Sequence, residues 1–110
     1  MTTSLFVVHS NPVEGLEAEF NDWYDNRHLD DILAIPGFTR ARRYKLSAAQ
    51  FTPFEQFKYL AMYEIEGDPA DAMAALQKAI DDGLYFAEAF SMEFYATVYD
   101  ELGSWKVSGK

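Results

Sequence analysis

Residues 20–44 of this chain read FNDWYDNRHLDDILAIPGFTRARRY. In this stretch a helical segment rich in aromatic residues and carboxylates is followed at once by a Pro-Gly turn and an arginine-rich strand. Tyr24 and His28 are four residues apart, a spacing that places two side chains on the same side of a helix. Because an imidazole exchanges protons near neutral pH, this pair is the first candidate for catalysis.

The composition limits the classes of protein to which the chain can belong. Its 110 residues, 49% of them hydrophobic, suit one domain over residues 1–110. The net charge of −9 disfavours binding to nucleic acid. The chain has no cysteine, no apolar run of about 20 residues and no charged leader before an apolar core. We therefore expect a cytoplasmic protein that does not bind membranes.

The hydrophobic pattern predicts six elements in the order β-α-β-β-α-β. Asn11-Pro12 and Asp68-Pro69 both read as helix starts, and each opens a βαβ-like half. The first helix should bend or end near His28, since α-helical counting would otherwise place Arg27 in the apolar stripe. The order is that of a ferredoxin-like α+β fold, with two helices on one face of a four-stranded antiparallel sheet. The expected strands are 5–9, 38–46, 57–66 and 92–99, and the second helix should run to about Asp82.

The third and fourth strands are apolar on both faces, which two helices on one side of the sheet cannot cover. On the third strand Tyr63 and its alternate neighbours point one way, and Leu60 and Met62 point the other way. A sheet with one wet face would alternate cleanly between apolar and polar residues. We therefore expect a homodimer that packs sheet against sheet.

The runs WYDNRHLDDILAIPGF and RARRYKL resemble the dimeric α/β-barrel superfamily, and most closely its EthD-like group. The resemblance covers nearly the whole chain. It implies paired sheets that close into a barrel, with a mostly apolar pocket between sheet and helix. Relatives of this kind include cyclases, dehydratases, monooxygenases, lyases and isomerases that act on small hydrophobic molecules, so the fold does not fix the reaction.

His28 and Tyr24 are the candidate catalytic residues. His28 could act as a general acid or base, positioned by Tyr24 and by a carboxylate such as Asp31 three residues later. It could equally cap the end of the first helix, where a cation is favoured. Tyr24 could bind a substrate oxygen or orient His28, or could simply pack with its hydroxyl at the rim of the core. The resemblance favours the pocket, because the matching histidine in relatives often faces it.

The candidate substrate-binding residues lie around this pair. Asp31 can also belong to a solvated acidic surface. Arg43, at the position of an arginine in the second strand of relatives, could bind a substrate anion, but a structural pair with a carboxylate such as Glu64 is favoured. Trp23 is more often core, since it continues an apolar stripe. The full set of candidates is Phe20, Trp23, Asp31, Arg43, Tyr63 and Phe94.

A metal site has little support in the sequence. His9 ends the first strand on the face of Leu5 and Val7, and a structural histidine is the simpler interpretation. His9 and His28 are far apart, and no HxH or HxxxH spacing occurs. We expect neither a metal nor another cofactor.

These observations favour a cofactor-independent lyase, dehydratase or cyclase acting on a small aromatic or polyketide-like molecule, with His28 as the proton-transfer group. A cofactor-free or haem-dependent monooxygenase is the second interpretation. A non-catalytic protein that binds a small molecule is the third. The sequence does not name the substrate.

Overall fold

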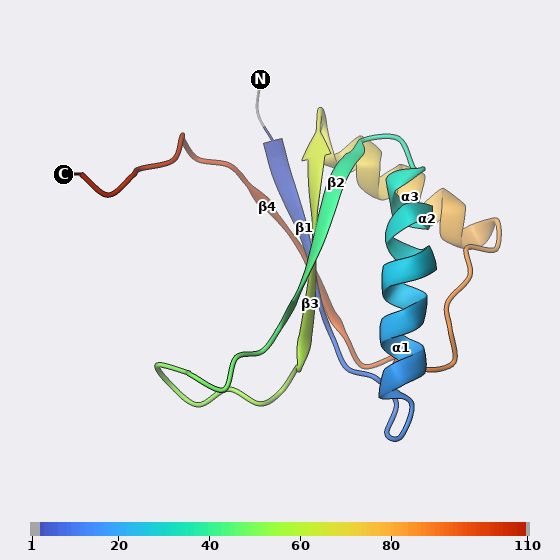
Figure 1. Cartoon of the computed structure of the whole chain (residues 1–110). Helices are drawn as coiled ribbons and strands as arrows, with labels where there is room; N and C mark the ends of the chain where they lie inside the picture. Colours follow the sequence, from blue (N-terminus) through green and yellow to red (C-terminus); the bar gives the residue numbers. More distant parts are fainter. Residues whose placement is uncertain (1–2, 110) are drawn as a thin grey trace.

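The computed structural model describes residues 3–109 and shows a four-stranded antiparallel sheet with helices on one face (Figure 1). The strand order is β2-β3-β1-β4. The expected ferredoxin-like order of elements is confirmed. The elements are β1 (Thr3–Ser10), α1 (Glu17–Trp23), the π-helical turn η1 (Tyr24–His28), α2 (Leu29–Leu33), β2 (Phe38–Lys45), β3 (Tyr59–Glu66), α3 (Pro69–Asp81) and β4 (Tyr95–Asp100).

The first helix begins later than expected. Asn11 is not its N-cap, because its side chain fastens the loop between β2 and β3 instead: Nδ2 donates to the carbonyl of Gln56 and Oδ1 accepts the N–H of Lys58, both at 2.8 Å. Helix α1 starts only at Glu17, after Gly15 turns the chain with a positive φ of 84°. Asn11 therefore holds a loop that is distant in the sequence, a contact that local spacing does not reveal.

The expected irregularity near His28 is a π-helical turn, η1, that joins α1 to α2. A π turn closes its hydrogen bond over one more residue than an α turn does, so it rotates the residues that follow it. In this chain the rotation moves Arg27 out of the apolar stripe, where regular α-helical counting would place it. Arg27 points outward with 57% of its side chain exposed, whereas His28 is turned into the core.

The second helix, α3, begins as expected. The side chain of Asp68 accepts the N–H of Ala70 at 2.9 Å, and Pro69 occupies the first turn. The start of β2 packs closely against this helix, because a Cβ built on Gly37 would lie 3.1 Å from that of Ala72. Within residues 3–109, no helix is both long enough and apolar enough to cross a membrane.

The sheet has a helix-covered face and an open face. On the covered face Phe6, Tyr63 and Ile65 belong to the main hydrophobic core. Strand β4 is shorter than expected and begins at Tyr95. A register shift between Phe38 and Arg40 puts Phe38 on the covered face, not beside Arg40 and Arg42 as simple alternation suggests.

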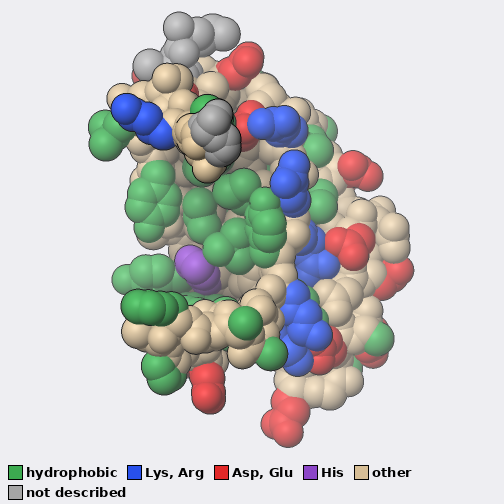
Figure 2. All heavy atoms as spheres, turned by 60° about the vertical axis from the view of Figure 1, so that its left-hand side comes forward, with side chains coloured by type: hydrophobic (Ala, Val, Ile, Leu, Met, Phe, Trp, Pro, Cys, Tyr) green, Lys and Arg blue, Asp and Glu red, His purple; other side chains and the backbone are tan. Residues whose placement is uncertain are grey.

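The open face of the sheet, on the side opposite the helices, carries a band of apolar side chains (Figure 2). Within residues 3–109 most of these side chains remain partly or fully exposed, although Val7 is buried. Strands β3 and β1 each supply a row of apolar side chains there. The strand register assigns these residues to the open face: Leu5, Val7, His9, Tyr44, Leu60, Met62, Tyr95, Thr97 and Tyr99, together with the charged Arg40, Arg42 and Glu64.

Candidate functional site

His28 ends the π-helical turn η1 and is enclosed by aromatic rings. Its imidazole stacks on the indole of Trp23, with ring centroids 4.3 Å apart, and meets the ring of Tyr24 edge-on at 5.1 Å. The ring of Phe86, from the segment between α3 and β4, covers it at 5.2 Å. Only 4% of His28 is exposed. The predicted Tyr24–His28 pair is therefore a buried contact, and the end of the helix is not a solvent-exposed cap.

The environment of His28 favours the neutral imidazole. Burial lowers the pKa of His28 from 6.5 to about 4, and the negative charge of Asp31 opposes this only in part. Asp31 does not orient the imidazole. It accepts a hydrogen bond from Nε of Arg27 at 3.3 Å, and His28 Nδ1 has no hydrogen-bond partner. At neutral pH the side chain can thus accept a proton.

Several buried polar atoms near this pair have no hydrogen-bond partner within the described chain. Such atoms are uncommon in folded proteins, because an unpaired buried donor or acceptor costs about 1–3 kcal/mol. Trp23 Nε1–H and the Tyr63 hydroxyl can donate, and His28 Nδ1 can accept if its proton is on Nε2. A water, or a bound molecule that carries oxygen atoms, would supply the missing hydrogen bonds. The atoms are Ser10 Oγ, Trp23 Nε1, His28 Nδ1, Arg43 Nε and Tyr63 OH.

The phenols of Tyr24 and Tyr63 are both buried. Burial raises the pKa of Tyr24, and the neighbouring hydroxyls of Ser10 and Tyr63 and the charge of Arg43 oppose the change. The pKa of Tyr63 is raised well above 10, first by burial and then by Tyr24. Both phenols are therefore neutral near pH 7 and serve as hydrogen-bonding groups.

Arg43 is partly buried beside Tyr24 and holds η1 and α1 against the sheet. Its Nη1 donates to Asp25 and its Nη2 donates to Asn21, both at 2.8 Å. Its guanidinium carbon lies 4.5 Å from the centroid of the Tyr24 ring. Only 12% of the side chain is exposed. The sequence indicated a paired arginine correctly but gave the wrong partner.

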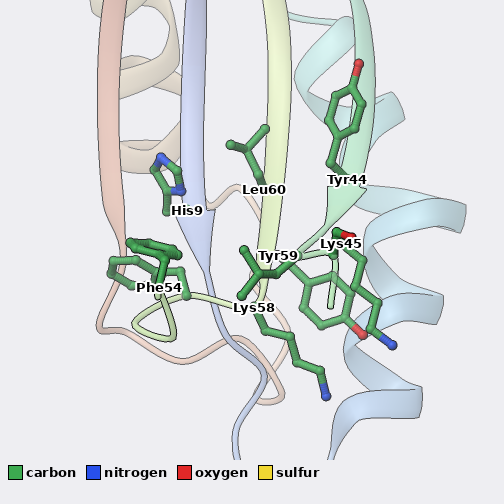
Figure 3. Close-up of a pocket in the computed structure, with 10 residues that line it drawn as sticks. His9, Tyr44, Lys45, Phe54, Lys58, Tyr59 and Leu60 are labelled. Carbon is green, nitrogen blue, oxygen red and sulfur yellow. The ribbon is translucent and has the colours of Figure 1, made fainter. Parts of the chain in front are cut away.

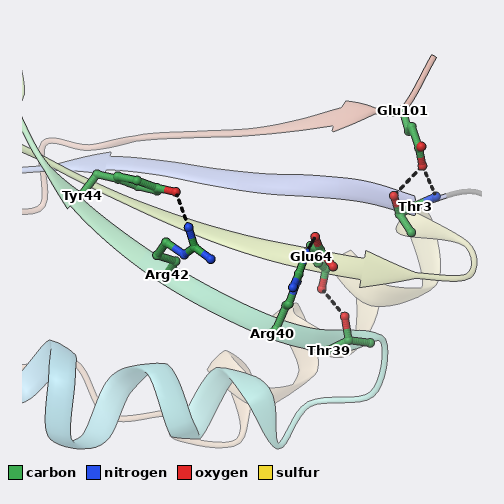
Figure 4. Close-up of polar contacts among 7 residues, drawn as sticks. All are labelled: Thr3, Thr39, Arg40, Arg42, Tyr44, Glu64 and Glu101. Atoms are coloured by element: carbon green, nitrogen blue, oxygen red, sulfur yellow. Dashed lines mark hydrogen bonds and ion pairs between the residues drawn. The ribbon is translucent and has the colours of Figure 1, made fainter. Parts of the chain in front are cut away.

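Glu64, the suggested partner of Arg43, is on the open face and pairs with Arg40 instead, at 2.8 Å (Figure 4). The reason is the register of β2 on β3. Arg40 lies opposite Glu64 and points to the open face, whereas Arg43 lies opposite Ala61 and points to the helices.

Two other candidate residues, Phe20 and Phe94, differ in how closely they approach the Tyr24–His28 pair. Phe20 is fully buried and packs edge-on against Tyr24, with centroids 5.3 Å apart. Phe94 lies just before β4, is 42% exposed, and contacts Phe90 at 5.4 Å. Phe94 therefore reaches the site only through Phe90.

Sequence reasoning missed the residues that close the site. Phe86 and Phe90 both contact Trp23, with centroids 6.1 and 5.6 Å away, and they come from a segment with no predicted element. Phenylalanine recurs every four residues at positions 86, 90 and 94, and this spacing could have indicated that the segment packs on the core. Phe86, 37% exposed, is the outermost of the rings that contact His28.

His9 lies elsewhere, on the open face, beside a cavity of about 230 Å³ (Figure 3). The cavity includes Phe54 and Phe57 of the β2–β3 loop, residues 46–58. His9 and His28 are on opposite faces of the sheet, so they cannot share a metal ion. Within residues 3–109, no group of three or more His, Cys, Asp or Glu side chains could hold one.

No protein-family model matches the chain. One curated protein, "Core atranone cluster (CAC) protein 1" of Stachybotrys chlorohalonatus, is 40% identical over 50 residues. The match includes 46% of this chain and 20% of that protein, so the chain spans only a fifth of the relative's length.

Solved structures with the same fold cover almost the whole chain. An ethyl tert-butyl ether D (EthD) family protein of Bacillus halodurans is 14% identical, with a TM-score of 0.57 over 93% of this chain and 100% of its own. A DABB family protein with a ferredoxin-like fold from Mesorhizobium loti is 16% identical, with a TM-score of 0.59 over 94% and 100%. HapK from Hahella chejuensis is 19% identical, with a TM-score of 0.50 over 99% and 100%.

Proposed function

From the ferredoxin-like fold that this chain shares with EthD and DABB proteins, we propose that it is a small-molecule enzyme that performs acid/base chemistry. His28 is the proton-transfer group and Tyr24 its helper. The substrate is hydrophobic, aromatic or polyketide-like, and the reaction is of the lyase, dehydratase or cyclase type, without a cofactor. The fold alone does not support this choice of reaction, so the support must come from the site.

The observation that carries the proposal is a buried, unpartnered imidazole nitrogen beside an unpartnered indole N–H. His28 Nδ1 and Trp23 Nε1 belong to two rings stacked at 4.3 Å. An acceptor next to a donor suits a substrate in which a proton is removed close to an oxygen atom. A neutral imidazole is the base, and the indole N–H stabilises the charge that develops on the oxygen.

The remaining residues then have distinct roles. The phenol of Tyr24, in edge-on contact with His28, and that of Tyr63 supply hydrogen bonds to a second polar group of the substrate. Phe20 and Phe90 form an apolar wall that excludes water, which strengthens these hydrogen bonds. Arg43 acts as a positioning residue through Asn21 and Asp25.

Access requires a movement of the segment between α3 and β4. Phe86 covers the imidazole and is itself partly exposed, so a substrate would enter by displacing this ring. The segment has no regular hydrogen-bonded structure over most of its length, which favours such a movement. Asp31 and Phe94 lie at the margin of the site, where they would contact only a larger substrate.

A test of the chemistry does not require the natural substrate. An aromatic ketone such as 2-hydroxyacetophenone exchanges the protons beside its carbonyl slowly in D₂O, and a positioned base accelerates this exchange. We expect the wild-type protein to accelerate it and His28→Ala to lower the rate by about 10²–10⁴-fold with the fold preserved. Ile80→Ala, on the exposed side of α3, is the control and should keep the wild-type rate. Saturable binding of the ketone with no acceleration would favour the non-catalytic interpretation.

We also propose that the protein is a homodimer in which two open faces pack together. The support is the apolar band on that face, where Leu60, Met62 and Tyr99 remain partly or fully exposed in the described chain. Sheets pack about 10 Å apart through such faces. An isologous dimer would cover both faces with a single contact.

A further inference from the structure

Two parts of the chain project from the sheet on its open side. The C-terminal arm, residues 101–109, leaves the end of β4, and the β2–β3 loop leaves the opposite end of the sheet (Figure 1). The register fixes these ends, since Asp100 pairs with Ser4 at one end of the sheet, whereas Tyr59 pairs with both Lys45 and Ser10 at the other. The open face is therefore bordered at one end by the arm and at the other by the loop.

The arm presents apolar side chains that make almost no contact with their own chain. Leu102 is 103% exposed, Trp105 94% and Val107 84%. A tryptophan in this setting stabilises nothing within the single chain, because it buries almost no apolar area. The observation points to a partner surface.

The loop, at the other end, provides an aromatic cavity. His9, Tyr44, Phe54 and Phe57 are among its lining residues, and its volume is about 230 Å³ (Figure 3). Pockets for drug-sized ligands usually measure about 300–1,000 Å³. The cavity is therefore too small for most ligands of that class and is better matched to one large aromatic side chain.

Two-fold symmetry brings these two features together. When two open faces pack about an axis that lies between the sheets and runs across the strands, the arm end of one sheet faces the loop end of the other. Sheets pack about 10 Å apart, and six extended residues reach about 20 Å. The arm is thus long enough to cross from its own sheet to the loop of the partner.

The charges on the open face do not oppose this contact. The chain carries a net charge of −9, but the groove beside the arm is lined by Arg40 and Arg42 as well as by Glu64. Arg40 and Glu64 neutralise each other at 2.8 Å, and Arg42 donates to the Tyr44 hydroxyl at 3.3 Å (Figure 4). Two copies can therefore meet here without the repulsion between like charges that would suppress association.

We infer that the two copies exchange their C-terminal arms, with Trp105 of each copy seated in the aromatic cavity of the other, beside His9 and Phe54. This inference rests on the proposed dimer and adds to it the segment that holds the dimer together. Each cavity is incomplete without the partner, because the side chain that fills it comes from the other copy.

The test is a double-mutant cycle on the dimer dissociation constant, measured by sedimentation equilibrium. Trp105→Ala and Phe54→Ala should each weaken the dimer by about tenfold or more, as expected of an aromatic residue at the centre of a contact. The double variant should be scarcely weaker than the worse single variant, because the two side chains share one contact. Ile80→Ala is the matched control, since Ile80 is 39% exposed on the helical side and Phe54 is 40% exposed.

Acrylamide quenching gives a second measurement. Trp23 is 6% exposed, so quenching reports mainly on Trp105, which should be protected in the dimer and quenched in a monomeric variant. A dimer of wild-type affinity with Trp105→Ala, or strictly additive effects of the two substitutions, would overturn the arm exchange and leave the dimer standing. A wild-type monomer would overturn both, whereas the exchange assay with His28→Ala tests the chemistry independently.

Discussion

The imidazole of His28 stacks on the indole of Trp23, with ring centroids 4.3 Å apart and planes inclined by 27°. Residues five apart lie about 140° apart around a regular α-helix, at about 100° per residue. They could not stack in that geometry. The contact exists because the turn Tyr24–His28 is π-helical. Single π turns are often found at functional sites, and this one brings the imidazole of His28 into the core.

Stability should depend on pH through His28. Its pKa is about 4 in the folded chain, below the ordinary value of 6.5, so between these values the unfolded chain binds more protons. Stability is then complete above pH 6.5 and is lost as the pH falls toward 4, by about 3 kcal/mol. Urea unfolding of the wild type and of His28→Gln at pH 7 and pH 4 measures this change in the free energy of unfolding. The variant should lose about 3 kcal/mol less than the wild type does, and equal losses would contradict a buried neutral imidazole.

Tyr24→Phe should reduce turnover less than His28→Ala does. The substitution keeps the packing against Phe20 and His28 and removes only the hydroxyl, whose hydrogen bond is worth about 0.5–1.5 kcal/mol, or roughly tenfold in rate at most. The exchange rate of the aromatic ketone measures both variants. The wild-type rate should also fall at acidic pH with an apparent pKa near 4, the value for His28. A fall in rate with an apparent pKa of 6.5 would instead indicate that the imidazole is exposed to solvent.

Arg43→Ala should destabilise the fold by about 2–3 kcal/mol. It removes the two hydrogen bonds that the guanidinium donates to Asp25 and Asn21, and its contact with the Tyr24 ring. The loss is smaller than for a fully buried ion pair, because Asp25 is 58% exposed and can be solvated. Chemical denaturation provides the measurement. Arg43→Lys should recover less than half of the loss, since lysine cannot bond Asn21 and Asp25 with the same planar fork.

Sedimentation equilibrium at micromolar concentration should give twice the 12.6 kDa chain mass. Met62→Glu puts a charge in the middle of the open face, opposite Val7 and Arg42, and should yield monomers. Ile80→Glu, on the exposed side of α3, should remain dimeric. A dimer that persists in Met62→Glu would place the interface on another surface.

Gly37→Ala should cost more stability than Gly83→Ala. Both glycines have positive φ, 100° and 104°, so alanine introduces backbone strain of about 1–2 kcal/mol at either site. At Gly37 the added Cβ would also lie 3.1 Å from Cβ of Ala72, whereas nothing lies within 4 Å at Gly83. Thermal unfolding measures both losses, and their difference gives the cost of the contact between the added Cβ and Ala72. Equal losses would show that α3 yields freely at this contact.

The sequence by itself determined the order of the elements, and it indicated Tyr24 and His28 as the candidate site. Local signals sufficed for this: the period of the apolar residues, the Asp68-Pro69 helix start, the Pro36-Gly37 turn and the spacing of Tyr24 and His28. The apolar residues at successive positions of β3 were likewise enough to predict that both faces of the sheet are covered, because side chains on a strand point alternately to its two sides.

Tertiary structure alone decided the rest, since those contacts join residues far apart in the chain. Asn11 bonds to the β2–β3 loop instead of capping a helix. The register of β2 on β3 places Glu64 opposite Arg40, with which it pairs. Arg43 points to the other face and donates to Asn21 and Asp25. Phe86 covers His28 from a segment in which no helix or strand was predicted. Burial by such distant groups sets the pKa of His28, and a local spacing carries no information about how far the imidazole is removed from water.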